Sequence, residues 1–89
     1  MDKIKVVVRM SIKINGNPAV WYKDIELAIP PQYHMILLEV THPHTKECAV
    51  VEAVCANAHT VIADIGTISL SGDAARAALN TMSDDGWHR

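Results

Sequence analysis

Strict alternation of apolar and polar side chains over residues 3–14 is the feature that most constrains this chain. The even-numbered positions from Ile4 to Ile14 are all apolar, whereas the odd-numbered positions are polar except Val7. A period of two places successive side chains on opposite faces of the backbone, as in a β-strand with one face against a core. We therefore expect a long half-buried strand near the start of the chain.

A turn and a second strand follow. Residues 15–18 are Asn-Gly-Asn-Pro, and Asn and Gly both tolerate the positive φ angles of tight hairpin turns. Over residues 19–29, apolar side chains alternate with Tyr22 and acidic side chains, and Pro30-Pro31 ends the pattern. We predict that this second strand pairs antiparallel with the first.

The hairpin has two possible registers. A four-residue loop pairs Arg9 with Asp24, and a two-residue loop pairs Lys5 with Glu26. Either register places opposite charges next to each other on the exposed face. We predict the four-residue loop, because it keeps Pro18, which has no N–H group, out of the hydrogen-bonded ladder.

The middle of the chain is harder to assign. Residues 32–42 are apolar on both faces over four positions, which predicts a central strand covered on both sides. Residues 47–58 fit a strand or a helix, because their valines favour a strand while Ala and Glu favour a helix. We predict a strand, since residues 61–70 also have a strand pattern and residues 56–58 can turn a hairpin. Gly66 indicates a β-bulge or a close approach of backbone.

The C-terminal segment predicts a helix. Ser71 is a suitable N-cap, and Asp73 lies in the first turn, where a negative charge complements the helix dipole. Gly86 fits the left-handed position that follows a helix, and Trp87 fits the hydrophobic contact of a Schellman motif. An apolar stripe of small and medium side chains lies between these ends: Ala75, Ala78, Leu79 and Met82.

These elements predict an α+β fold. We expect an antiparallel β-meander of four to five strands, as an open sheet or a small barrel, with one C-terminal helix packed on it. A chain of 89 residues leaves no room for a second core, so residues 1–89 are expected to form a single domain.

Composition excludes several classes of protein. A formal net charge of −2 argues against a strongly basic nucleic-acid binder, so we expect no nucleic-acid partner. No apolar run approaches the ~18 residues of a membrane span, and residues 1–5 do not resemble a signal peptide. Two cysteines, Cys48 and Cys55, are too few for a disulfide scaffold. We expect both to be reduced, buried thiols in a cytoplasmic protein.

His42, His44 and Cys48 are the candidate metal ligands, with His34 or His59 as a fourth. Nitrogen and sulfur donors are those that zinc prefers, but this spacing matches no strong zinc signature. The alternative is a polar loop with two solvated histidines and one buried thiol. Since the sequence also lacks a phosphate-binding loop, a nucleophile elbow and a recognisable catalytic carboxylate pair, we predict no catalytic residue and no cofactor.

Four side chains are the candidate interface. Tyr22 and Tyr33 combine an apolar ring with a polar tip, which is favoured at interfaces. Lys5 and Arg9 belong to a basic stripe on the exposed face of the first strand, which could contact phosphates. The interpretation that we prefer is a solvated face, neutralised by the acidic residues of the neighbouring strand.

The order of these features resembles small β-rich proteins carried in integron gene cassettes and in phages. The resemblance rests on the alternating basic first strand, Pro30-Pro31, a short Met-containing strand, a valine-rich hairpin and the Gly86-Trp87 pair. It implies a self-associating accessory protein of a mobile genetic element, and no site residue carries over from it.

We therefore expect a non-enzymatic binding module that works as a homodimer. Apolar residues make up 49% of the chain, more than so small a core can hide, and an open sheet leaves unpaired strand edges. Two alternatives stay open. One is a phage- or plasmid-borne inhibitor that occupies the surface of a host defence complex. The other is a ligand- or metal-binding module that uses His42, His44 and Cys48.

Overall fold

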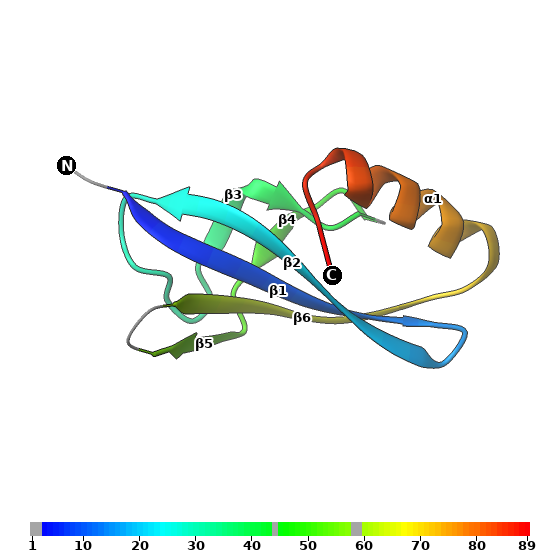
Figure 1. Cartoon of the computed structure of the whole chain (residues 1–89), viewed down its shortest axis with the longest axis horizontal. Helices are drawn as coiled ribbons and strands as arrows, with labels where there is room; N and C mark the ends of the chain where they lie inside the picture. The colour runs from blue at the N-terminus through cyan, green and yellow to red at the C-terminus, as the bar shows by residue number, and fades with distance from the viewer. Residues whose placement is uncertain (1–2, 44, 58–59) are drawn as a thin grey trace.

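The computed structural model describes residues 3–43, 45–57 and 60–89 (Figure 1). Across these residues, six strands precede one helix. In chain order these elements are β1 (Ile4–Ile14), β2 (Asn17–Leu27), β3 (Ile36–Thr41), β4 (Cys48–Val50), β5 (Ala53–Ala56), β6 (Val61–Leu70) and α1 (Gly72–Asp84).

The strands form an open four-stranded sheet and a two-stranded ribbon. The sheet has the order β2-β1-β6-β5, and the ribbon consists of β3 and β4. The α+β class, the open sheet and the C-terminal helix are thus confirmed. The antiparallel meander of four to five strands is confirmed only in part: β1–β2 and β5–β6 are antiparallel neighbours, but β6 pairs parallel with β1, and the described residues form six strands. The chain leaves the sheet after β2, forms the ribbon, and returns through β5, so that β6 reaches the free edge of β1 in the same direction.

The β1–β2 hairpin has the shorter of the two possible loops. Ile14 is paired with Asn17 and Lys5 with Glu26, so the prediction of a four-residue loop is wrong. Asn15 and Gly16 have φ angles of 52° and 85°, the conformation that matches a two-residue turn to the strand twist. Pro18 is tolerated because it follows a hydrogen-bonded pair, which turns its nitrogen away from β1 toward the sheet edge.

The middle segment forms strands, but in a different arrangement from the predicted one. Within the described residues β3 has a strand neighbour on one side only, and Ile36 and Leu38 are exposed, so the prediction of a central, doubly covered strand is wrong. The strand prediction for residues 47–58 is confirmed over β4 and β5, and the helix alternative is wrong. β5 pairs with β6 as a hairpin, as expected.

A corner at Val51 and Glu52 joins the ribbon to the sheet. The Val51 N–H donates to the Met35 carbonyl at the start of the ribbon (2.8 Å), and the Glu52 N–H donates to the Asp64 carbonyl in β6 (2.8 Å). Val51 is therefore bonded to the ribbon, while the next residue, Glu52, is bonded to the four-stranded sheet. A strand that bends in this way passes from one sheet to the other.

The predicted irregularity at Gly66 is confirmed. The β1–β6 register shifts between Arg9 and Ser11, and Gly66 there has a φ of +97°. A Cβ atom at this position would lie 2.9 Å from Cδ of Glu52 and closer still to Oε2. The positive φ at the bulge therefore favours glycine, and a Cβ atom here would also require the Glu52 carboxylate to move.

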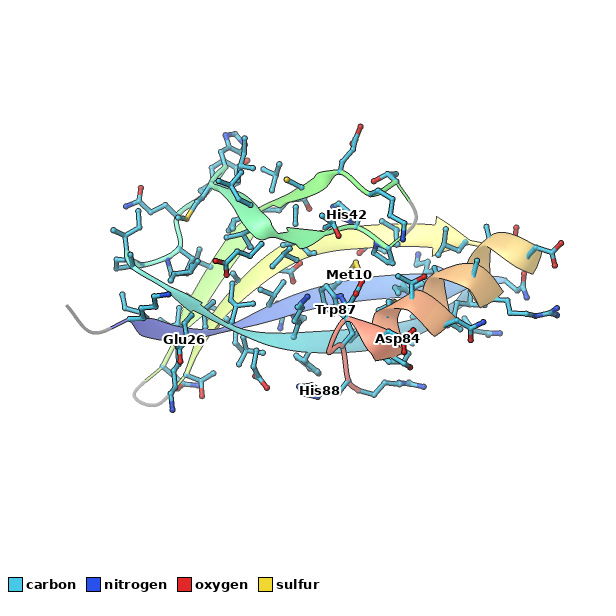
Figure 2. All side chains as sticks on the ribbon, turned by 90° about the horizontal axis from the view of Figure 1, so that it is seen from above. Met10, Glu26, His42, Asp84, Trp87 and His88 are labelled. Atoms are coloured by element: carbon cyan, nitrogen blue, oxygen red, sulfur yellow. The ribbon has the colours of Figure 1, made fainter. Side chains whose placement is uncertain are left out.

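One face of the sheet carries the core. Figure 1 shows α1 and the β3–β4 ribbon on the same side of the sheet. Figure 2 shows Trp87 beside Met10 between them, and both belong to one buried cluster. The remaining buried side chains come from all three parts: Val6, Val8, Ile12, Leu37, Val40, Ala49, Val51, Ala63, Ile65, Leu70, Ala75, Ala78 and Met82.

The end of α1 and the C-terminal tail fix the helix to β2. The Trp87 N–H donates to the Met82 carbonyl (3.0 Å), which is the bond of a Schellman motif, as predicted. The next residue, His88, exchanges two backbone hydrogen bonds with Tyr22 (2.6 and 2.8 Å) and so covers one position of the β2 edge. In the part of the chain that the structure describes, no helix is long and apolar enough to cross a membrane.

Candidate interaction surface

The predicted metal ligands are not assembled by the described residues. His42 is half-buried at the end of the ribbon, and its Nδ1 is buried without a hydrogen-bond partner. Cys48 is exposed at the start of β4, while His44 and His59 lie outside the described residues. Across residues 3–43, 45–57 and 60–89, no group of three or more His, Cys, Asp or Glu side chains is placed to hold a metal ion.

The cysteines and His34 occupy separate places on the surface. Cys48 in β4 and Cys55 in β5 are both free and exposed, so the expectation that they are buried is wrong. The physical reason is that β4 and β5 are short strands at the margins of their sheets, where one flank meets solvent. His34 stacks on the ring of Tyr33, with centroids 3.8 Å apart.

Three of the four predicted interface residues lie on the face of the sheet away from α1. Arg9 donates to Asp64 of the neighbouring β6 (Nε to Oδ2, 2.9 Å), so it pairs with that strand and not with β2. Tyr22 is half-buried beside the ring of His88, with centroids 6.2 Å apart. Lys5 is exposed opposite Glu26. Arg9 and Tyr22 thus contact side chains of their own surface, and Lys5 is in register with an acidic residue.

The fourth, Tyr33, is exposed three residues before β3, which carries a second surface that sequence analysis did not identify. The exposed fractions of Tyr33, Ile36 and Leu38 are 67%, 57% and 80%, and Val50, paired with Ile36 across the ribbon, is 39% exposed. These four residues are called the β3 patch below. Soluble proteins seldom expose several large apolar side chains together without a function in association.

A shallow groove runs beside the β3 patch, between β3 and the C-terminal end of β2. Its volume is about 190 Å³, and it is lined by Ile25, Leu27, Met35, Ile36, Leu37, Leu38 and Glu39. Apart from Glu39 these are all apolar, and Leu37 is part of the buried core. The groove therefore brings a side chain of the hydrophobic core to the edge of the solvent-exposed surface.

Both walls of the groove are strand edges with polar backbone groups. The alternation of hydrogen bonds along β1–β2 turns the N–H and C=O of Asp24 and Glu26 away from β1, as observed for Tyr22 with His88. Along the ribbon, where the Met35 carbonyl accepts from the Val51 N–H, the same alternation turns the N–H and C=O of Ile36 away from β4, and the regular pairing with β4 ends at Leu37. Figure 2 shows Glu26 on the part of β2 far from α1, beyond the reach of the tail that covers Tyr22. An edge of this kind can pair with a further strand.

A signal for the β3 patch was present in the sequence. The apolar run over residues 35–38 was interpreted as evidence of cover on both faces. An equally direct interpretation is a strand with one face in the core and the other toward a partner. Periodicity cannot distinguish the two, because both produce apolar residues at successive positions.

Comparisons with known proteins give no relative. No protein-family model matches the chain, and neither a curated protein nor a solved structure matches it.

Proposed function

We propose that this protein is a small non-enzymatic interaction module that binds another polypeptide through the β3 patch. The observation that carries the proposal is the exposure of Leu38, 80%, at the rim of a groove floored by core side chains. An apolar side chain in that position gains free energy when a partner covers it, at roughly 25 cal/mol per Å² of apolar area.

Backbone and side chains support the same mode of binding. Free N–H and C=O groups on two strand edges can bond an added strand, while the apolar side chains alongside contact its residues. Alternate residues of the bound strand would face the groove, so the partner segment is expected to be extended and apolar at every second position.

The proposed cellular compartment and the proposed biological role rest on the free thiols and on the resemblance noted in the sequence. Exposed free thiols at Cys48 and Cys55 are best preserved in a reducing environment, which supports a cytoplasmic protein. The resemblance to integron-cassette and phage proteins supports an accessory role in a mobile genetic element.

Site-specific photo-crosslinking in the source cell tests the proposal. A photoreactive amino acid at position 38 should give one discrete protein adduct. The same label at position 69, where Ser69 is exposed at the far end of β6, should give none. In the chain labelled at position 38, the substitution Ile36→Lys should abolish the adduct. Absence of any adduct at position 38, or equal adducts at both positions, would contradict the proposal.

A further inference from the structure

The structure points to a second copy of this chain as the partner. We infer a two-fold dimer in which β3 of each protomer pairs antiparallel with β3 of the other, forming one ribbon of order β4-β3-β3-β4. This inference rests on the proposed function, since it names the partner of the same β3 patch.

The amount of exposed surface fits a protomer of a dimer. The chain exposes 5743 Å², whereas the size law for folded monomers gives about 5,200 Å² for a mass of 9.8 kDa. A standard interface buries about 800 Å² of each partner. One such interface would lower the exposed area per chain below the area that the size law gives for a monomer of this mass.

Self-association of the β3 patch brings no like charges together. Its four members, Tyr33, Ile36, Leu38 and Val50, are all uncharged. A different protein would usually be recognised through charges that complement charges on this surface. The β3 patch has no charged side chain that could select such a partner. A surface that is apolar and uncharged is complementary to itself, as a two-fold interface must be.

The free backbone groups select one register. On the edge of β3 that faces the groove, the pairing of the ribbon turns the backbone groups of Ile36 outward, and we place those of Leu38, two residues further along the strand, on the same edge. Centring the two-fold axis on Leu37 pairs Ile36 of each copy with Leu38 of the other and uses all of these groups. Centring on Ile36 would instead require His34, whose N–H is already bonded to the Val51 carbonyl (2.8 Å).

The same register also gives the exposed apolar side chains of β3 suitable neighbours in the other copy. Ile36 and Leu38 would pack against each other across the axis on the exposed face, in two equivalent pairs. Glu39 would lie opposite Met35, so the acidic side chains of the two copies would not face each other. The register centred on Leu37 therefore satisfies both the backbone hydrogen bonds and the packing of the side chains.

Sedimentation analysis of the full chain tests the dimer and its surface. We expect a dimer at micromolar concentration for the unmodified protein. Leu38→Lys should raise the dimer dissociation constant by about 100-fold, because it places two charges in an apolar contact. Leu38 is 80% exposed, so this variant should retain the unfolding midpoint of the parent monomer.

The matched control is Val20→Lys. Val20 is 37% exposed on β2, on the face of the sheet away from α1, and its substitution should leave the dissociation constant unchanged. A dimer that survives Leu38→Lys, or that dissociates with Val20→Lys, would place the interface elsewhere and overturn the inference.

Cysteine trapping tests the register. In a background with Cys48→Ser and Cys55→Ser, the double variant Ile36→Cys/Leu38→Cys should form a covalent dimer on mild oxidation. Opposed residues in a hydrogen-bonded pair have Cα atoms about 5.5 Å apart, within disulfide range. Leu38→Cys alone should remain uncrosslinked, because position 38 would lie opposite position 36. Efficient crosslinking of that single variant would contradict the register.

The dimer and the proposed function can fail separately. If the protein is a monomer at 100 micromolar or more and position 38 crosslinks to a different polypeptide, the inferred dimer is wrong and the interaction module stands. If position 38 crosslinks to nothing, both are wrong. An adduct with twice the mass of the chain supports both.

Discussion

β1 and β3 are both rich in aliphatic side chains, yet they differ sharply in burial. Along β1, Val6, Val8, Met10 and Ile12 are buried almost completely, whereas two of the apolar residues of β3 are largely exposed. β1 has a strand on each side, and its core face is covered by the ribbon and α1. β3 has one strand neighbour, and only one of its faces meets the core. The comparison teaches that the number of neighbours, and not apolar content, decides burial.

The largest expected effect comes from truncating one large apolar side chain to alanine in each region. Met10→Ala should lower the free energy of unfolding by about 2–5 kcal/mol, because it leaves a cavity in a fully buried position. Leu38→Ala should change it by no more than about 0.5 kcal/mol, as measured by urea denaturation at a concentration where the chain is monomeric. Similar losses for both variants would show that β3 is buried and break the comparison.

The next effect concerns the corner that joins the two regions. Gly66→Ala should lower the free energy of unfolding by about 1–3 kcal/mol, because alanine is strained at a φ of +97° and its Cβ meets Glu52. In the Glu52→Ala background the loss should be smaller, since only the backbone strain remains. Thermal unfolding of the four combinations measures the coupling. Full additivity would mean that Glu52 does not pack against Gly66.

A smaller effect is expected at Asp64, whose carboxylate accepts one hydrogen bond from a side chain and one from the backbone. Asp64 accepts hydrogen bonds from Arg9 (2.9 Å) and from the Gly66 N–H (2.7 Å). Asp64→Ala should therefore cost about 1–2 kcal/mol, whereas Arg9→Gln should cost less than about 1 kcal/mol, the usual value of a partly exposed ion pair. Only the ion-pair contribution should weaken in 1 M salt. Equal losses for both variants would show that the bond to Gly66 contributes nothing.

The smallest expected effect lies at the edge of β2 that the tail covers. His88→Pro removes the N–H that donates to the Tyr22 carbonyl and should cost about 0.5–1.5 kcal/mol. Hydrogen exchange at the amide of Tyr22 should become faster, while exchange at Trp21, which bonds inward to β1, should not change. Arg89→Ala, at the next position of the tail, is the control. Unchanged exchange at Tyr22 would mean that the tail does not cover this edge.

Local patterns were enough to predict much of the fold. The alternation over residues 3–14, the presence of a turn within residues 15–18, the irregularity at Gly66 and the helix ending at Gly86-Trp87 all depend on interactions within a few residues. The register of the first hairpin was mispredicted because Pro18 was weighed without its position in the hydrogen-bond pattern. Once the two-residue turn is formed, that position needs no N–H group.

The candidate site was predicted less well. Of the proposed interface residues only Tyr33 lies at the β3 patch, because the others were chosen for side-chain chemistry and not for the neighbours they would meet. The metal hypothesis for His42 and Cys48 also depended on convergence in space, which spacing along the chain cannot show. The cysteines were expected to be buried from the average behaviour of free thiols, although their strands lie at the margins.

The sequence by itself determined which segments are largely extended, that a turn follows the first strand, and how the helix ends, because each depends on steric and hydrogen-bonding preferences of adjacent residues. Only the tertiary structure decided that β6 joins β1 in parallel, that the chain bends at Val51-Glu52 and that β3 keeps one edge free. Those outcomes depend on which distant segments meet. An apolar strand has the same pattern whether its second face is covered by its own chain or left for a partner.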